Sequence, residues 1–168
     1  SLDESHLRVY QAIASGVAAS LEDQYFSRDF ASTAIARLVA AASNPTLLLG
    51  DPADREVAWG GHLPLTARTI GDLLSDVASA TRPAKLLVTA SIAKEHADRG
   101  EKLLVWTNFI GNVRELERLL EPHNPAVIFG SVARDDPAAA TDRVRQLQKF
   151  REDPTCSVLI ATPQTLGE

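Results

Sequence analysis

Residues 101–168 read EKLLVWTNFIGNVRELERLLEPHNPAVIFGSVARDDPAAATDRVRQLQKFREDPTCSVLIATPQTLGE. Short apolar runs at 103–107, 125–131 and 157–163 alternate with stretches at 111–121 and 136–153, in which apolar residues recur every three or four positions. Runs of the first kind are typical of buried parallel strands, and the second kind predicts helices. The order is therefore strand, helix, strand, helix, strand, which predicts an α/β fold built on a parallel sheet.

Small polar residues follow each predicted strand and mark a candidate binding edge. They are Thr107-Asn108, Gly130-Ser131 and Thr162. In open parallel sheets, ligands bind beyond the carboxyl ends of the strands. Hydroxyl, amide and glycine residues there expose backbone N–H groups near helix N-termini, which suits a phosphate. The alternative is that these residues only cap helices and form turns, and local geometry by itself favours that interpretation.

The predicted elements also carry expectations about packing. Parallel strands joined by helices need right-handed crossovers, so the two connecting helices are expected to share one face of the sheet. Trp106 lies inside the first strand and is expected in the core rather than as a stacking platform for a base. The helix that begins at Asp136-Pro137 is expected to end at Asp153-Pro154 and to bury three apolar residues. These are Val144, Leu147 and Phe150.

Residues 1–100 are predicted to form a helical segment, with a Gly/Pro-rich loop near 50–64. Two amphipathic helices are expected before Asn44-Pro45, and two more at 66–80 and 82–100, the last with Gly100 past its end. Apolar residues at helical spacing define the expected buried faces of the first two helices. They are Leu7, Tyr10, Ile13, Val17 and Leu21 in one, and Phe30, Ile35, Leu38 and Val39 in the other.

Composition narrows the class of protein. The 168 residues are 45% hydrophobic, which suits one domain or one domain with a helical appendage. The net charge of -5 excludes a surface coated in basic residues, so any contact with nucleic acid would have to be local. The single cysteine, Cys156, excludes an intrachain disulfide and fits a reducing compartment, so a cytoplasmic location is expected. No apolar run is long enough to span a membrane, and no membrane partner is expected.

Several catalytic signatures are absent from the sequence. It contains neither G-x-x-x-x-G-K-[ST] nor G-x-G-x-x-G. Its histidines, His6, His62, His96 and His123, lack metal-ligand spacing. Cys156 has no histidine nearby in the sequence and is expected to be a buried, inert thiol. No catalytic residue and no metal site are therefore expected in this chain.

The succession of KLLVWTNF, IFGS, RVRQLQKF and DPTCSVLIATPQTLGE resembles the second RecA-like lobe of superfamily-two helicase-like ATPases, particularly the Swi/Snf type. KLLVWTNF resembles motif IV, and VLIATPQTLGE resembles the opening of motif V. Arg143 and Phe150 match an arginine and a phenylalanine in the helix between them. The resemblance spans residues 35–168, and its specificity lies in the order and spacing of motifs that are individually weak.

The resemblance implies a partial RecA-like parallel three-layer sheet domain of β-α-β-α-β order at residues 101–168, preceded by the helical segment. This domain would be the first half of a helicase C-terminal lobe, truncated within motif V. Its sheet is expected to expose an unpaired edge, because the remaining strands of such a lobe are not in this sequence.

The resemblance also implies partners. In relatives, the loops after these strands run along the nucleic-acid backbone as contacts independent of base sequence. Nucleic acid, with double-stranded DNA as the preferred form, is therefore expected at Thr107, Asn108, Gly130, Ser131 and Thr162. In motif V, Gly167 and Glu168 are expected to couple the nucleotide cleft to the nucleic-acid track.

A longer parent protein is expected to bind ATP and Mg²⁺ between this lobe and an N-terminal ATPase lobe. This segment lacks a P-loop and the motif that carries the arginine finger, so it is expected to hold no cofactor and to be inactive alone. One alternative is a non-catalytic α/β protein-interaction module derived from such a lobe, which the acidic charge and the missing motifs favour. A flavodoxin-like small-molecule binder is a weaker alternative, because no glycine-rich loop follows the first strand.

Overall fold

A computed structural model describes residues 4–22, 28–49, 74, 77, 82–130 and 137–163 of the chain. The chain divides into two compact units, Ser1–Lys85 and Leu86–Glu168. The domain boundary predicted near residue 100 stays a prediction, because compactness does not show which segment folds alone. The Gly/Pro-rich loop, most of the helix expected at 66–80, and the site residues Ser131, Gly167 and Glu168 lie outside the described residues.

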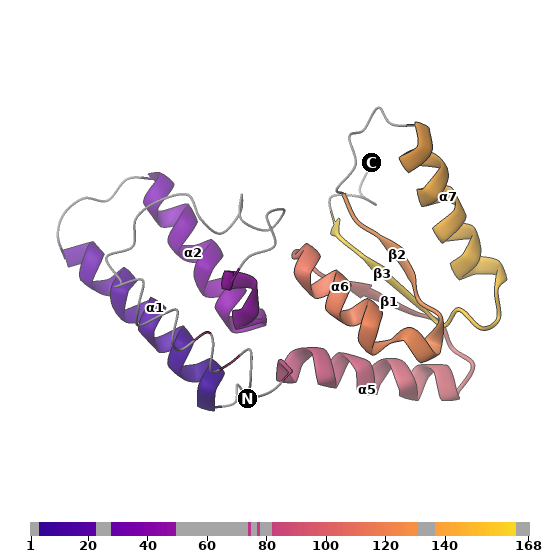
Figure 1. Cartoon of the computed structure of the whole chain (residues 1–168), viewed down its shortest axis with the longest axis horizontal. Coiled ribbons are helices and arrows are strands. Elements are labelled where there is room, and N and C mark those ends of the chain that lie inside the picture. Colours follow the sequence, from indigo (N-terminus) through magenta and orange to yellow (C-terminus); the bar gives the residue numbers. More distant parts are fainter. Residues whose placement is uncertain are drawn as a thin grey trace. The chain divides into compact units, whose positions relative to one another are not determined.

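The first unit contains helices α1 (Glu4–Glu22) and α2 (Arg28–Ser43) and the 3-10 helix Pro45–Leu49, and α1 packs against α2 (Figure 1). Asn44 ends α2 as predicted, and its side-chain Oδ1 accepts bonds from the Thr46 N–H at 3.0 Å and the Thr46 hydroxyl at 2.7 Å. The predicted buried faces are only partly right. Ile13 is buried, whereas the exposed residues include Leu7, Ile35 and Val39.

The buried face of α2 contains three alanines, together with Arg37, in place of the large apolar residues expected. Ala34, Ala40 and Ala41 are almost fully buried, whereas Ile35 is 62% exposed. Small side chains let helix backbones approach closely, and the larger branched residues then occupy the neighbouring stripe of the helix surface. The prediction from hydrophobicity alone was therefore wrong for Ile35 and Val39.

The second unit is built on a parallel sheet, as predicted (Figure 1). Its strands are β1 (Leu103–Trp106), β2 (Ala126–Ile128) and β3 (Val158–Ala161), in the order β1-β3-β2. Its other elements follow the predicted succession. They are α5 (Ala84–Asp98), α6 (Ile110–Leu119), the 3-10 helix Glu121–His123, and α7 (Pro137–Glu152).

Helices cover both faces of the sheet and form three layers. Leu86 and Ala93 of α5 and Val113 and Leu116 of α6 form one core cluster with Val158 and Ile160 of β3. On the other face, Leu147 and Phe150 of α7 pack against a second cluster. All of β3 is buried, because it lies between the other strands and under both layers. The predicted α/β three-layer architecture is confirmed.

The expectation that both connecting helices share one face is wrong. Because β3 lies between β1 and β2, the chain crosses the sheet one way through α6 and returns the other way through α7. Right-handed crossovers in opposite directions place their helices on opposite faces. The local pattern of apolar residues contains no information on strand order, so this arrangement was not predictable from it.

Trp106 is 47% exposed, and its expected place in the core is also wrong. It lies on edge strand β1, while α7 packs on β2 and β3. Val144 of α7 is 62% exposed, so its expected burial is wrong. Phe150 and Gln146, one turn apart, point toward the sheet and its β2 edge, which leaves Val144 on the solvent side. None of the described helices has the length and apolar character needed to cross a bilayer.

Candidate nucleic-acid interface

The carboxyl ends of the three strands lie level with one another at one edge of the sheet. Trp106 and Ile128 both pair in register with Ala161. Beyond them, the Thr107 N–H donates to the Ala161 carbonyl at 3.1 Å, and the Thr162 N–H donates to the Ile128 carbonyl at 3.1 Å. The structure therefore brings Thr107, Thr162 and the segment that begins at Phe129 to the same edge, as the sequence predicted.

The loop after β1 holds Thr107 in a defined orientation. Its Oγ1 accepts long contacts of 3.4 Å from the Phe109 N–H and from the side-chain amide of Asn112. Both contacts use the oxygen as an acceptor, so the hydroxyl hydrogen remains available to an acceptor outside the loop. Asn112 is buried in the first turn of α6, and sequence reasoning missed it. The available signal was an amide residue adjacent to Val113 on an otherwise apolar helix face.

The other predicted site residues differ in accessibility. Asn108 and Gly130 are exposed. Thr162 is only 4% exposed, so its hydroxyl is not open to a large ligand in this structure. The accessible part of the edge therefore consists of the loop after β1 and the segment after β2.

Polar residues at the opposite edge of the sheet, where the strands begin, form hydrogen bonds with one another. Asn124, in the left-handed region with φ 45°, donates to Asp153 Oδ2 at 3.1 Å and to the Thr155 hydroxyl oxygen at 2.9 Å. Asp153 Oδ1 accepts from the Thr155 hydroxyl at 2.7 Å and from its N–H at 2.8 Å. The Thr155 side-chain hydrogen bond is the main cause of the lowered pKa of Asp153. These groups satisfy each other, which indicates that this edge has a structural role.

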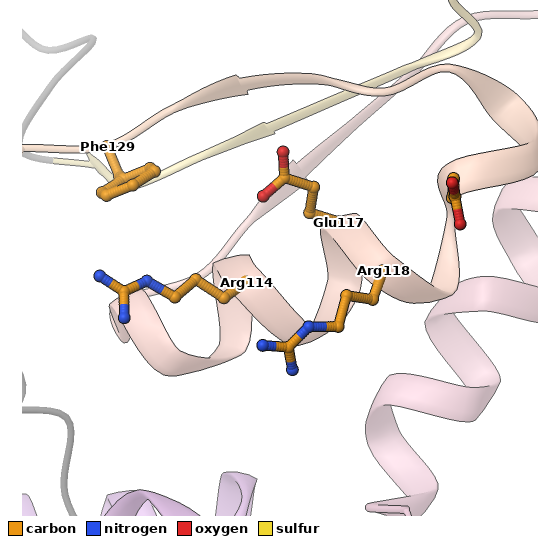
Figure 2. Close-up of a pocket in the computed structure, with 5 residues that line it drawn as sticks. Arg114, Glu117, Arg118 and Phe129 are labelled. Carbon is orange, nitrogen blue, oxygen red and sulfur yellow. The ribbon is translucent and has the colours of Figure 1, made fainter.

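A groove of about 520 Å³ runs along α6 beside the segment after β2 (Figure 2). Arg114 and Phe129 lie at one end of it, with Glu117 and Arg118 further along the helix. Arg118 donates to Glu115 at 2.9 Å. The residues that line the groove are Arg114, Glu117, Arg118, Glu121 and Phe129. Sequence reasoning did not single out Arg114, although an arginine on the second turn after a strand-end loop was a usable signal.

No protein-family model and no curated protein matches the sequence. The structure, however, is similar to that of the Sulfolobus solfataricus SWI2/SNF2 ATPase C-terminal domain, with a TM-score of 0.61. This chain has the fold of that domain. The similarity covers 94% of this chain and 57% of the solved one, at 14% sequence identity. The resemblance inferred from the order of the motifs is thus confirmed for the fold.

Within this SWI2/SNF2-like fold, Cys156 is fully buried in the cluster under α7, and its thiol lies 3.7 Å from the Val158 carbonyl oxygen. Its predicted burial is confirmed. Among the described residues, no three histidine, cysteine, aspartate or glutamate side chains gather closely enough to hold a metal ion.

Proposed function

We propose that this chain is part of the second motor lobe of a nucleic-acid-dependent ATPase and that the carboxyl edge of its sheet contacts the nucleic-acid backbone. The observation that carries the proposal is the level alignment of the strand ends, two of which, β1 and β2, present Thr107, Asn108 and Gly130. The polar groups at the opposite edge are occupied with one another. The similarity in fold to a SWI2/SNF2 ATPase domain supports the same conclusion.

Neutral donors suit this task. The Thr107 hydroxyl and the Asn108 side-chain amide each offer a hydrogen to a phosphate oxygen without reading a base. In the parent protein, ATP and Mg²⁺ would bind between this lobe and an N-terminal ATPase lobe. Gly167 and Glu168 would couple that cleft to the nucleic-acid track. The nucleic acid that we propose for this interface is double-stranded DNA.

Binding of a short fluorescein-labelled DNA duplex to the 168-residue chain, followed by fluorescence anisotropy, tests the proposal. Asn108→Ala is expected to weaken binding about fivefold, the loss of roughly one net hydrogen bond of about 1 kcal/mol. Gln148→Ala removes another exposed amide, on α7, whose partner is Glu152 at 2.9 Å, and should leave binding unchanged. Equal affinities of the two variants would count against the edge as the interface, and a matched RNA duplex distinguishes the substrates.

A protein-interaction module is the second candidate function. Exposed Leu104 and Trp106 on β1 favour it, because large apolar side chains on a sheet edge are usually covered. A protein partner whose binding is insensitive to salt, combined with no detectable binding of nucleic acid, would establish this candidate in place of the first.

A further inference from the structure

We infer that Arg114 is the cationic phosphate contact of the carboxyl edge. This inference rests on the proposed function and extends it to a residue outside the motifs that resemble the helicase lobe. It assigns the end of the α6 groove that lies beside the strand ends to one phosphate of the nucleic-acid backbone.

The position of Arg114 follows from the topology. Helix α6 begins at Ile110, directly after the loop that contains Thr107 and Asn108, so the fifth residue of the helix is about 6 Å along its axis. Arg114 shares the groove with Phe129, which follows the last residue of β2 and precedes exposed Gly130 (Figure 2). The Arg114 side chain therefore lies at the Phe129 end of the groove, on the helix that begins directly after the loop of Thr107 and Asn108.

Charge explains why this position matters. Thr107, Asn108 and Gly130 are neutral, so on their own they displace few counterions from nucleic acid. An arginine presents a planar array of donors that matches two phosphate oxygens and keeps its charge at every relevant pH. The amino end of α6 adds a favourable partial positive charge nearby. Arg114 thus supplies the electrostatic component that the sequence-predicted residues lack.

The rest of the groove is poorly suited to an anion. Glu117 of α6 and Glu121 of the 3-10 helix that follows line it further along. Arg118, one turn beyond Arg114, is paired with Glu115 at 2.9 Å. A phosphate placed there would meet carboxylates on the same wall, so the binding site is confined to the Arg114 end.

The two arginines provide a matched pair of variants on one helix. Arg114→Gln and Arg118→Gln each remove one positive charge from an exposed position of α6. The full chain and both variants are titrated against the same labelled DNA duplex over a series of potassium chloride concentrations. Circular dichroism and thermal unfolding confirm that each variant is folded as the parent is.

Arg114→Gln is expected to weaken binding several-fold at low salt and to reduce the magnitude of the slope of log K against log salt by about 1. Arg118→Gln is expected to change neither quantity. An unchanged slope for Arg114→Gln, or equal reductions for both variants, overturns the role of Arg114 and leaves the proposed interface standing. Failure of the unmodified 168-residue chain to bind any duplex overturns both the role of Arg114 and the proposed interface.

Discussion

Gly100 shows how a single residue fixes the connection between helix and sheet. It has φ +71° and follows the end of α5, where the Glu101 N–H bonds to the His96 carbonyl at 2.9 Å and the Gly100 N–H bonds to the Ala97 carbonyl at 2.9 Å. This is the Schellman pattern, in which a left-handed residue lets the chain reverse and satisfies the last carbonyls of the helix. It directs the chain from α5 into β1.

Replacing Gly100 by alanine is expected to lower the free energy of unfolding by about 1 kcal/mol, because a Cβ disfavours the left-handed region. An added Cβ meets no atom within 4 Å, so the backbone conformation alone sets the cost. Guanidinium denaturation followed by circular dichroism measures it. Gly100→Asn should lose less, since asparagine tolerates this conformation, and equal losses for the two variants would contradict the explanation.

At the scale of elements, Lys102 ties the start of β1 to the end of α7. Its ammonium donates to the Phe150 carbonyl and, at 3.0 Å, to the Asp153 carbonyl, and it lies 5.3 Å from the centroid of the Phe150 ring. A cation at a helix C-terminus is favourable because the last carbonyls lack partners within the helix. The contact spans the sequence from the first strand to the second connecting helix, so no local pattern indicated it.

Lys102→Met keeps the apolar stem and removes the donor. It is expected to destabilise the chain by about 1 kcal/mol through the loss of these contacts. Lys94→Met is the matched control, because Lys94 pairs with the neighbouring Asp98 on the surface of α5, at 2.6 Å. Urea denaturation of the two variants should show a clear shift for the first alone. A shift of the same size for Lys94→Met would show that the C-terminal carbonyls of α7 are not the cause.

The sequence predicted the helices and strands better than it predicted how they pack against one another. Alternation of short apolar runs with helical periods identified each strand and connecting helix that the structure describes in the second unit, and the Asn44 and Asp153 helix ends followed from prolines. It also identified the carboxyl-edge residues, because parallel strands end together. It failed for the exposure of Trp106 and for which face of the sheet α6 and α7 cover, since both depend on strand order, and strand order is a property of the assembled sheet.

At the scale of the sheet, the two outer strands, β1 and β2, differ in how well they are covered. At the β2 edge, Gln146 of α7 accepts from the Val127 N–H at 3.1 Å, and Lys149 donates to the Pro125 carbonyl at 3.0 Å. Among the described residues, β1 pairs with β3 alone, and Leu104 and Trp106 are 41% and 47% exposed. An apolar strand with an open edge is a template for pairing with another chain, so β1 is the unpaired edge expected from the sequence.

The isolated chain is therefore expected to self-associate with increasing concentration through β1. Trp106→Lys should shift the equilibrium toward monomer, because a lysine on an edge strand opposes the pairing of strands from two chains. Val144→Lys, which makes a similar change at a residue 62% exposed on α7, should associate as the parent does. Sedimentation equilibrium over a range of concentrations measures the average mass of each. A parent chain that stays monomeric throughout, or equal effects of the two lysines, would show that the open edge of β1 does not govern association.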